Sequence, residues 1–172
     1  ERFFCEKIKK IFEEKKKIVD IGGGLRILRN KGNRYDHQRE WIVKYLHQSL
    51  HQVDYKVLDY TPTYHPDIVG DIHNLPLKSN STDAILCIAV LEHIENPFKA
   101  FDEMYRVLKK GGYLFVYVPF LYGYHAHQGY YGDYWRYTED SLKHLGKKFS
   151  SIEIQSVRGR FETQVCLPRF IR

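Results

Sequence analysis

Three consecutive glycines stand directly after a short apolar run in the segment KIVDIGGGLR, which spans Lys17–Arg26. Glycine lets a backbone turn sharply and approach another group closely, because it has no Cβ atom. The acid Asp20 precedes the first glycine by two residues, so a carboxylate and several backbone N–H groups meet at one turn. Such a turn suits a nucleotide-like ligand at a strand end, although a tight turn without a ligand would use the same glycines.

The dinucleotide-binding pattern G-x-G-x-x-G is only partly present at this turn. Gly22 and Gly24 could begin it, but Ile27 occupies its last position. An NAD-dependent reductase is therefore the least favoured of the nucleotide-binding enzymes.

A second stretch, Phe120–Leu142, is dense in tyrosine, histidine and glycine. Histidine is the natural general base near neutral pH, and a neighbouring carboxylate can orient it. We therefore predict that His125 or His127, with Asp133 nearby, deprotonates or orients an acceptor hydroxyl group.

Residues 120–137 are predicted to form a lid over the substrate, since aromatic planes and hydroxyl groups suit sugars and planar molecules. The predicted substrate contacts are Tyr131, Tyr134, Trp135 and Arg136. Two alternatives remain open: the aromatic side chains could be a packed surface, and Arg136 could form an ion pair with Asp133 that holds the lid.

The elements that must position these residues alternate between helix and strand. Apolar residues at helical spacing predict helices over 1–16, 35–52, 97–108 and 138–145. Apolar or alternating runs predict strands over 17–21, 55–60, 83–89, 113–119, 151–157 and 161–167. This order predicts one α/β domain over 1–172: a Rossmann-like, doubly wound, mostly parallel sheet with helices on both faces.

Composition narrows the classes of function. The chain has 172 residues and a net charge of +6 at pH 7, but its basic residues are scattered, so nucleic-acid binding is not favoured. Cys5, Cys87 and Cys166 are too widely spaced for a zinc motif or a disulfide framework. The apolar runs are too short to span a membrane. We expect a cytoplasmic protein that requires no metal, and the oligomeric state is left open.

The segment VDIGGG resembles the first motif, D/E-x-G-x-G, of the class I S-adenosylmethionine-dependent methyltransferases. In that family the glycines let the backbone approach the amino-acid end of the cofactor, and the acid reaches the cofactor's amino group. The resemblance implies these roles for Asp20, Gly22 and Gly24, with Ile21 and Gly23 in the same contact.

The resemblance extends through the block from Val69 to Pro119, whose motifs follow the order found in the family. It implies that Asp59, at the end of YKVLDYT, accepts hydrogen bonds from both ribose hydroxyls. The further cofactor contacts that it implies are Tyr60 beside the ribose, Asp71 and Ile72 around the adenine, and Cys87, Ile88 and Ala89 on the methionyl side.

The spacing of the two acids departs from expectation. Asp20 and Asp59 are 59 − 20 = 39 residues apart, whereas a glycine-rich turn and its ribose-binding acid are usually about 20 residues apart. We interpret residues 29–36 as an insertion after the glycine turn. Without that insertion, Asp54 or Asp36 would have to take the role of Asp59.

The segment GDYWRYTEDSL resembles a bacterial subgroup with the pattern H-x-x-P-x-D-Y-W-R-[YF]-T, many of whose members are associated with cell-surface polysaccharide or glycan biosynthesis. Residues 133–138 match its core, but Tyr131 replaces the proline and His127 lies one position too early for the histidine. The implied function is S-adenosylmethionine-dependent methyl transfer, as an O-methyltransferase, to a small-molecule or glycan acceptor. A nucleic-acid methyltransferase and a non-catalytic cofactor-binding module are the alternatives.

Overall fold

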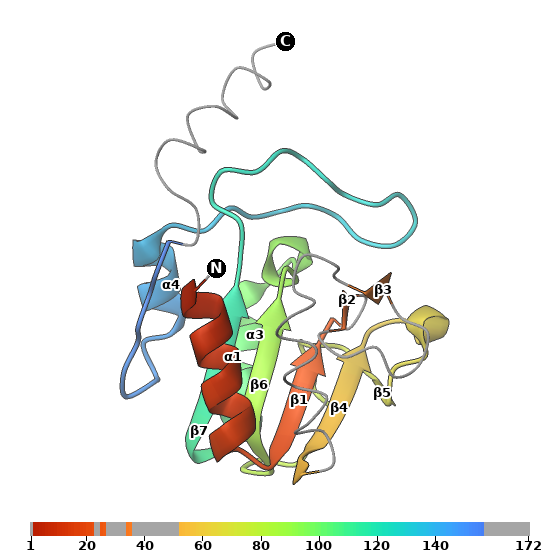
Figure 1. Cartoon of the computed structure of the whole chain (residues 1–172). Helices are drawn as coiled ribbons and strands as arrows, with labels where there is room; N and C mark the ends of the chain where they lie inside the picture. The colour runs from red at the N-terminus through yellow and green to blue at the C-terminus, as the bar shows by residue number, and fades with distance from the viewer. Residues whose placement is uncertain (1, 23–24, 27–33, 36–51, 157–172) are drawn as a thin grey trace.

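The computed structural model describes residues 2–22, 25–26, 34–35 and 52–156, and its centre is a five-stranded parallel sheet (Figure 1). The strand order is β5-β4-β1-β6-β7, so the order along the chain reverses between β1 and β6. These strands are β1 (Lys17–Ile21), β4 (Asp54–Asp59), β5 (Ile68–Val69), β6 (Thr82–Ile88) and β7 (Leu108–Tyr117). The predicted Rossmann-like α/β fold is confirmed.

Helices cover both faces of the sheet. Helix α1 (Arg2–Glu14) lies on one face, while α3 (Pro97–Val107) and α4 (Glu139–Leu145) lie on the other (Figure 1). Side chains alternate along a strand, so Ile18 packs toward α1 and Val19 packs toward α3. Burial on both faces explains why the strands are almost continuously apolar.

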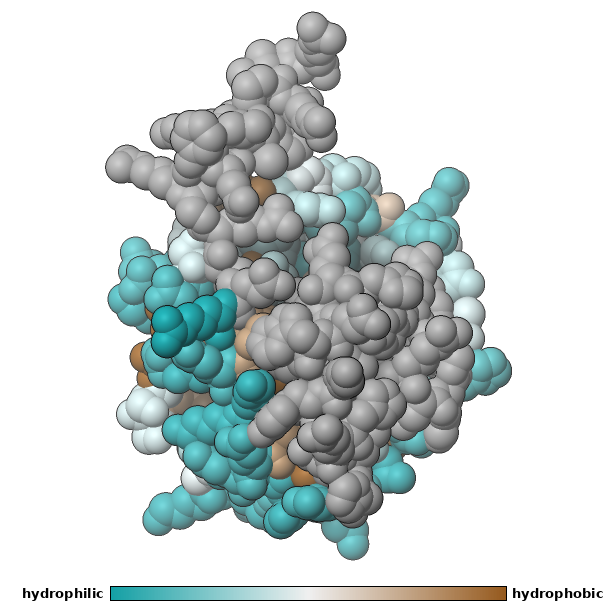
Figure 2. Space-filling view, viewed as in Figure 1, coloured by the Kyte–Doolittle hydropathy of each residue, from teal (hydrophilic) through white to brown (hydrophobic). Residues whose placement is uncertain are grey.

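The described α-helices bury apolar side chains, and two of them have side-chain caps. The apolar residues of α1 at helical spacing are buried, and the visible face around this helix is mostly hydrophilic where it is coloured in Figure 2. Asn96 caps α3 by accepting a hydrogen bond from the Lys99 N–H at 3.1 Å. Thr138 caps α4 in the same way through the Ser141 N–H at 3.2 Å.

Two sequence-based expectations differ from the structure, and one strand was not predicted. Residues 151–156 carry no strand, so the strand predicted over 151–157 is wrong for its described part. Strand β7 begins at Leu108, five residues earlier than predicted, because Leu108 pairs with Thr82 ahead of an irregular stretch that contains Gly111 at φ +74°. The regular register with β6 begins at Tyr113. The two-residue strand β5 is too short to leave a pattern in the sequence.

The predicted helix over 35–52 lies mostly outside the described residues, and the strand predicted over 161–167 lies entirely outside them.

The carboxyl ends of the five parallel strands form one edge of the sheet, at the top of Figure 1. The 3-10 helix η4 (Leu91–His93) follows β6 at this edge, and residues 120–137 pass above it. The 3-10 helix η3 (Pro62–Tyr64) follows β4. The two-residue strands β2 (Leu25–Arg26) and β3 (Arg34–Tyr35) pair separately from the main sheet. Within the described residues, no helix is long and apolar enough to cross a membrane.

Candidate functional site

Asp20 is a buried acid near the carboxyl end of β1. Its side chain is on the α1 face of the sheet, and the residue is only 3% exposed. The Tyr55 hydroxyl, on the neighbouring strand β4, donates a hydrogen bond of 2.5 Å to the Asp20 carboxylate. Tyr55 was not identified from the sequence as a site residue, because an aromatic residue in a strand usually indicates only core packing.

The first glycine of the turn is required by two separate constraints. Gly22 has φ +78°, a left-handed conformation that side chains rarely adopt. A Cβ atom at this position would also lie 2.2 Å from the Val90 side chain. The Gly22 N–H donates to the Leu58 carbonyl of β4 at 2.8 Å, which fixes the start of the turn. Ile21 is buried, while Gly23 and Gly24 lie outside the described residues.

Asp59 ends strand β4, directly beside this turn. In the parallel register Ile21 pairs with Leu58, so Gly22, the first residue after β1, lies next to Asp59, the last residue of β4. The Asp59 carboxylate accepts a hydrogen bond from the Thr61 N–H at 3.1 Å. Tyr60 is 74% exposed, so its ring is available to a ligand at this edge.

Asp54 and Asp36 were the alternatives to Asp59 as the ribose-binding acid. Asp54 pairs with Lys17 at the opposite, amino-terminal end of the sheet, so it cannot replace Asp59 at the glycine turn. Asp36 lies outside the described residues.

Asp71 and Ile72 lie just beyond β5. Asp71 accepts hydrogen bonds from the His73 N–H and ring Nδ1, both at 2.8 Å. Partial burial raises the pKa of Asp71, but these hydrogen bonds and the charges of His73 and Lys99 hold it below its ordinary value. Asp71 is therefore an exposed carboxylate at neutral pH, and it stands next to the buried Ile72.

The end of β6 provides an apolar wall. Cys87 is fully buried, and burial together with the nearby carboxylates of Glu92 and Asp20 raises the pKa of its thiol. The thiol is therefore a packing group and not a nucleophile. Ile88 is half-buried, and the exposed Ala89 takes φ +53° with its N–H donated to the Tyr117 carbonyl at 2.8 Å.

The predicted lid, residues 120–137, is attached to the segment that begins with η4 by several hydrogen bonds to backbone groups. The N–H groups of Tyr134 and Trp135 both donate to the Glu92 carbonyl, at 2.7 and 3.2 Å. The Trp135 indole donates to the Ile94 carbonyl at 2.8 Å, and the Tyr137 hydroxyl donates to the Leu91 carbonyl at 2.8 Å. Residues 134–137 are thus fixed against the segment that follows β6.

Arg136 and Asp133 form the internal ion pair that the sequence left open as an alternative. Two guanidinium N–H groups reach the Asp133 carboxylate, at 2.5 and 2.7 Å. The other three donate to the carbonyls of Tyr122, Gly123 and Trp135. All five N–H groups of Arg136 are therefore used within the lid. The hydrogen-bonded pairing with Arg136 lowers the pKa of the Asp133 carboxyl. Burial raises this pKa, but by less, so it stays well below its ordinary value.

Of the two candidate histidines, His125 is the one next to Asp133. The Asp133 carboxylate accepts the His125 backbone N–H at 2.8 Å and lies 3.3 Å from the ring Nδ1. His127 is exposed in the turn of the lid, where its ring contacts Tyr130 and Tyr131. Tyr131, Tyr134 and Trp135 expose 44%, 50% and 40% of their surface.

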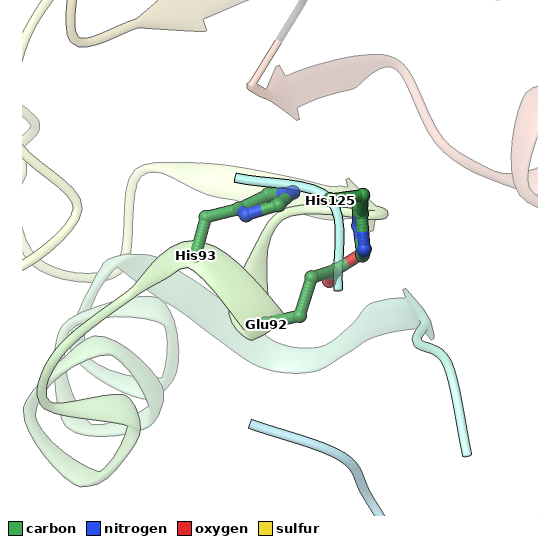
Figure 3. Close-up of side chains that lie close together, drawn as sticks. All are labelled: Glu92, His93 and His125. Atoms are coloured by element: carbon green, nitrogen blue, oxygen red, sulfur yellow. The ribbon is translucent and has the colours of Figure 1, made fainter. Parts of the chain in front are cut away.

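Glu92 and His93 were not predicted as site residues from the sequence, and both lie against His125 (Figure 3). Glu92 is 1% exposed, and burial raises the pKa of its carboxyl, although the charges of His125 and Arg136 counteract the rise. His93 is half-buried, with its ring 4.9 Å from that of His125 and 4.2 Å from that of Tyr131. Burial lowers the pKa of His93, despite its hydrogen bond with the Gly132 carbonyl. The available signal was the acid–histidine pair in LEHI, directly after a buried strand.

Comparison with known proteins identifies relatives of this chain. The family model described as "Methyltransferase domain" matches residues 19–116. An uncharacterised protein of Methanocaldococcus jannaschii is 36% identical over 111 residues, which cover 63% of this chain and 44% of the relative. An uncharacterised transposon protein of Streptomyces fradiae is 43% identical over 51 residues, which cover 30% of this chain and 15% of the relative. The chain thus spans less than half the length of these curated relatives.

Solved structures share the fold at low sequence identity. A S-adenosylmethionine-dependent methyltransferase from Mesorhizobium loti is 15% identical with a TM-score of 0.52, and the match covers 77% of this chain and 72% of that one. A protein from Pyrococcus horikoshii is 14% identical with a TM-score of 0.52, covering 90% and 82%. The family match extends over more than half of this chain and includes the glycine turn, both strand-end acids and the end of β6. The chain therefore belongs to the methyltransferase domain family, the class I S-adenosylmethionine-dependent methyltransferases.

Proposed function

We propose that the protein transfers the methyl group of S-adenosylmethionine to a hydroxyl group of a small-molecule or glycan acceptor. One observation carries the proposal: the register of β1 and β4 places the glycine turn beside Asp59, at the sheet edge over which the His125 segment passes. A methyl donor and a proton acceptor would then meet at one end of the sheet.

The cofactor would lie across the carboxyl ends of β1, β4 and β6. Asp20 and Gly22 would face its methionyl part, and Asp59 would accept hydrogen bonds from the ribose hydroxyls, since a carboxylate offers several acceptor lone pairs. Asp71 and Ile72 would border the adenine. The apolar wall of Cys87, Ile88 and Ala89 would close the methionyl side.

Methyl transfer from a sulfonium is a direct displacement. A bond forms between the acceptor oxygen and the methyl carbon while the carbon–sulfur bond breaks, and the sulfur leaves as a neutral thioether. The protein must therefore align oxygen, carbon and sulfur, and the hydroxyl proton must be removed.

His125 is the side chain that we assign to the proton. Its Nδ1 lies 2.9 Å from the Gly123 carbonyl and 3.3 Å from the Asp133 carboxylate, so the proton on the ring is held at Nδ1. The Nε2 lone pair is then available to an acceptor hydroxyl. His127 would contact the acceptor from the turn of the lid and not share this role.

A glycan acceptor is supported by the aromatic surface of the lid. Tyrosine and tryptophan rings present flat apolar faces together with polar groups, which suit the faces and hydroxyls of a sugar. The exposed rings are those of Tyr122, Tyr124, Tyr130, Tyr131, Tyr134 and Trp135. The DYWRYT segment, which resembles a subgroup associated with cell-surface glycans, belongs to the same lid.

The test is a transfer assay with isotopically labelled S-adenosylmethionine and a panel of mono- and oligosaccharides, with a nucleic acid and a phenol panel for comparison. Label should appear on a carbohydrate hydroxyl, and S-adenosylhomocysteine should form in equal amount. Cofactor binding without transfer to any acceptor class would instead support a non-catalytic module. Preferential labelling of nucleic acid would overturn the glycan assignment.

A further inference from the structure

Three side chains with lone pairs converge beside the lid: the carboxylate of Glu92 and the rings of His93 and His125 (Figure 3). One potential ligand atom from each lies within 4.8 Å of the other two. His125 Nε2 lies 3.9 Å from a Glu92 carboxylate oxygen. This is too long for a hydrogen bond, so no direct hydrogen bond joins these two groups.

Each histidine is held so that its Nδ1 carries a proton. His93 Nδ1 lies 2.6 Å from the Gly132 carbonyl, and His125 Nδ1 lies 2.9 Å from the Gly123 carbonyl. A carbonyl oxygen only accepts hydrogen bonds, so each Nδ1 must be the donor. In the neutral form of each ring, Nε2 is therefore unprotonated. A backbone carbonyl on the far nitrogen is the usual support for a metal-binding histidine.

Glu92 adds an unsatisfied buried oxygen. Within the described part of the chain, its Oε2 has no hydrogen-bond partner, although the residue is 99% buried. A buried carboxylate oxygen without a donor is costly. The cluster therefore contains several lone pairs, and one of them belongs to a buried oxygen that receives no hydrogen bond from the described residues.

We propose that Glu92, His93 and His125 bind a divalent transition-metal ion. Two imidazoles and one carboxylate are a ligand set for ions such as Zn²⁺, Mn²⁺ and Fe²⁺, and three protein ligands leave coordination positions open. Metal–ligand distances of about 2.1 Å correspond to ligand separations of roughly 3–4 Å. The widest separation in the cluster must therefore shorten by about 1 Å as the ion binds. The sequence-based expectation that no metal is required would then be wrong.

The position of the cluster indicates what the ion would do, and this step rests on the proposed methyl transfer. Glu92 follows the β6 turn, whose Val90 packs against Gly22 of the cofactor turn. An acceptor hydroxyl on an open coordination position would ionise more readily and release its proton to solvent. The oxygen would then attack the methyl carbon. His125 would act as a ligand instead of taking the proton itself.

The three side chains could also interact without a metal ion. A protonated Glu92 carboxyl could donate to His125 Nε2 after a small side-chain rotation, and the pair would then need no ion. His125 would in that case remain the general base of the proposed function. The two arrangements differ in whether the protein binds a cation in the absence of cofactor and acceptor.

The experiment is a Co²⁺ titration of chelator-treated protein, without cofactor or acceptor, followed by visible absorption and by competition with Zn²⁺. We expect one equivalent of Co²⁺ with d–d bands that Zn²⁺ displaces. Glu92→Gln, His93→Gln and His125→Gln should each weaken Co²⁺ binding at least tenfold. The exposed His144 on α4 serves as the matched control, and His144→Gln should leave the titration unchanged.

A thermal-shift measurement with S-adenosylhomocysteine on the same samples separates the two proposals. A normal shift without stoichiometric Co²⁺ binding would overturn the metal site and leave the methyltransferase proposal intact. Tight Co²⁺ binding that the three substitutions do not weaken would also overturn it, because the ion would lie elsewhere.

Discussion

The two halves of the sheet edge are held together in different ways. On the β4–β5 side, the acids are fixed by their own neighbours in the chain: Asp59 accepts from Thr61, and Asp71 accepts from His73. On the β6–β7 side, the contacts join residues far apart in the sequence. Tyr134 reaches Glu95 across 39 residues, and Tyr137 reaches Leu91 across 46.

This difference separates two tasks. In the proposed function, the cofactor would be bound by acids at strand ends, whose positions follow from the sheet itself. The acceptor would be bound by the lid, whose shape depends on an ion pair and on backbone carbonyls of η4. Changes in the first half should therefore affect cofactor binding alone, whereas changes in the second should affect turnover and lid stability.

The largest effect is expected from His125→Ala. Loss of a group that activates the acceptor oxygen, as general base or as metal ligand, should lower turnover by about 10²–10⁴-fold. Cofactor affinity should change little, because His125 lies in the acceptor half. Turnover and S-adenosylhomocysteine affinity measured on the same sample test this. The control is His127→Ala, for which less than a tenfold loss is expected; equal losses in both variants would contradict the assignment.

The next largest effect is expected from Asp133→Asn, which leaves the Arg136 charge without its carboxylate. The Asp133 side chain is fully buried in the pair and that of Arg136 is 26% exposed. Removing one partner of such a pair costs about 3 kcal/mol of unfolding free energy, which corresponds to roughly 6–12 °C in Tm. Thermal melts at pH 7 measure it. Lys148→Ala, which breaks an exposed pair with Asp102, should change Tm little.

The same pair predicts a pH dependence. The folded-state pKa of Asp133 lies below its unfolded value, so the stabilisation is complete above the unfolded pKa of about 3.9. It is lost as the pH falls through the folded pKa. The stability difference between the wild type and Asp133→Asn should therefore be full at pH 7 and shrink below about pH 4. A difference that grows in acid would contradict this origin.

A somewhat smaller effect is expected in the cofactor half. S-adenosylhomocysteine at a hundred times its Kd should add about 2.7 kcal/mol, or roughly 5–10 °C in Tm, and Asp59→Ala should abolish most of this shift. Asp54→Ala, at the other end of the same strand, is the matched control and should keep it. NAD should give no shift with any variant. A full shift in Asp59→Ala would show that the ribose is held elsewhere.

The smallest effect is expected from Glu92→Gln in metal-free protein. The folded-state pKa of Glu92 is raised, chiefly by burial, so its contribution is most favourable in acid and is lost as the pH rises through that pKa. The neutral amide avoids this cost and can donate to His125. Chemical denaturation at pH 8 should show a gain of about 1 kcal/mol, with almost no gain at pH 4. A loss of stability at pH 8 would contradict it.

The same contrast explains what the sequence could predict. Strand β1 with Gly22 after it, and the strand that ends in Asp59, follow from short-range patterns, and both lie within one residue of the predicted positions. The proximity of Glu92 and His125 depends on residues 33 positions apart in the sequence coming together, so neither residue alone indicated the cluster. The ion pair between Arg136 and Asp133 could be proposed from the sequence, because the two residues are three positions apart. The structure adds that backbone carbonyls accept the remaining N–H groups of Arg136.

The contact between Gly22 and Val90 has an evolutionary consequence. A side chain at position 22 would need both a left-handed backbone and the space that the Val90 methyl groups occupy. The two positions are therefore a coupled pair, although they lie 68 residues apart in the sequence and belong to different strand ends. Across an alignment of relatives, an asparagine or alanine at position 22 should occur together with a glycine or alanine at position 90.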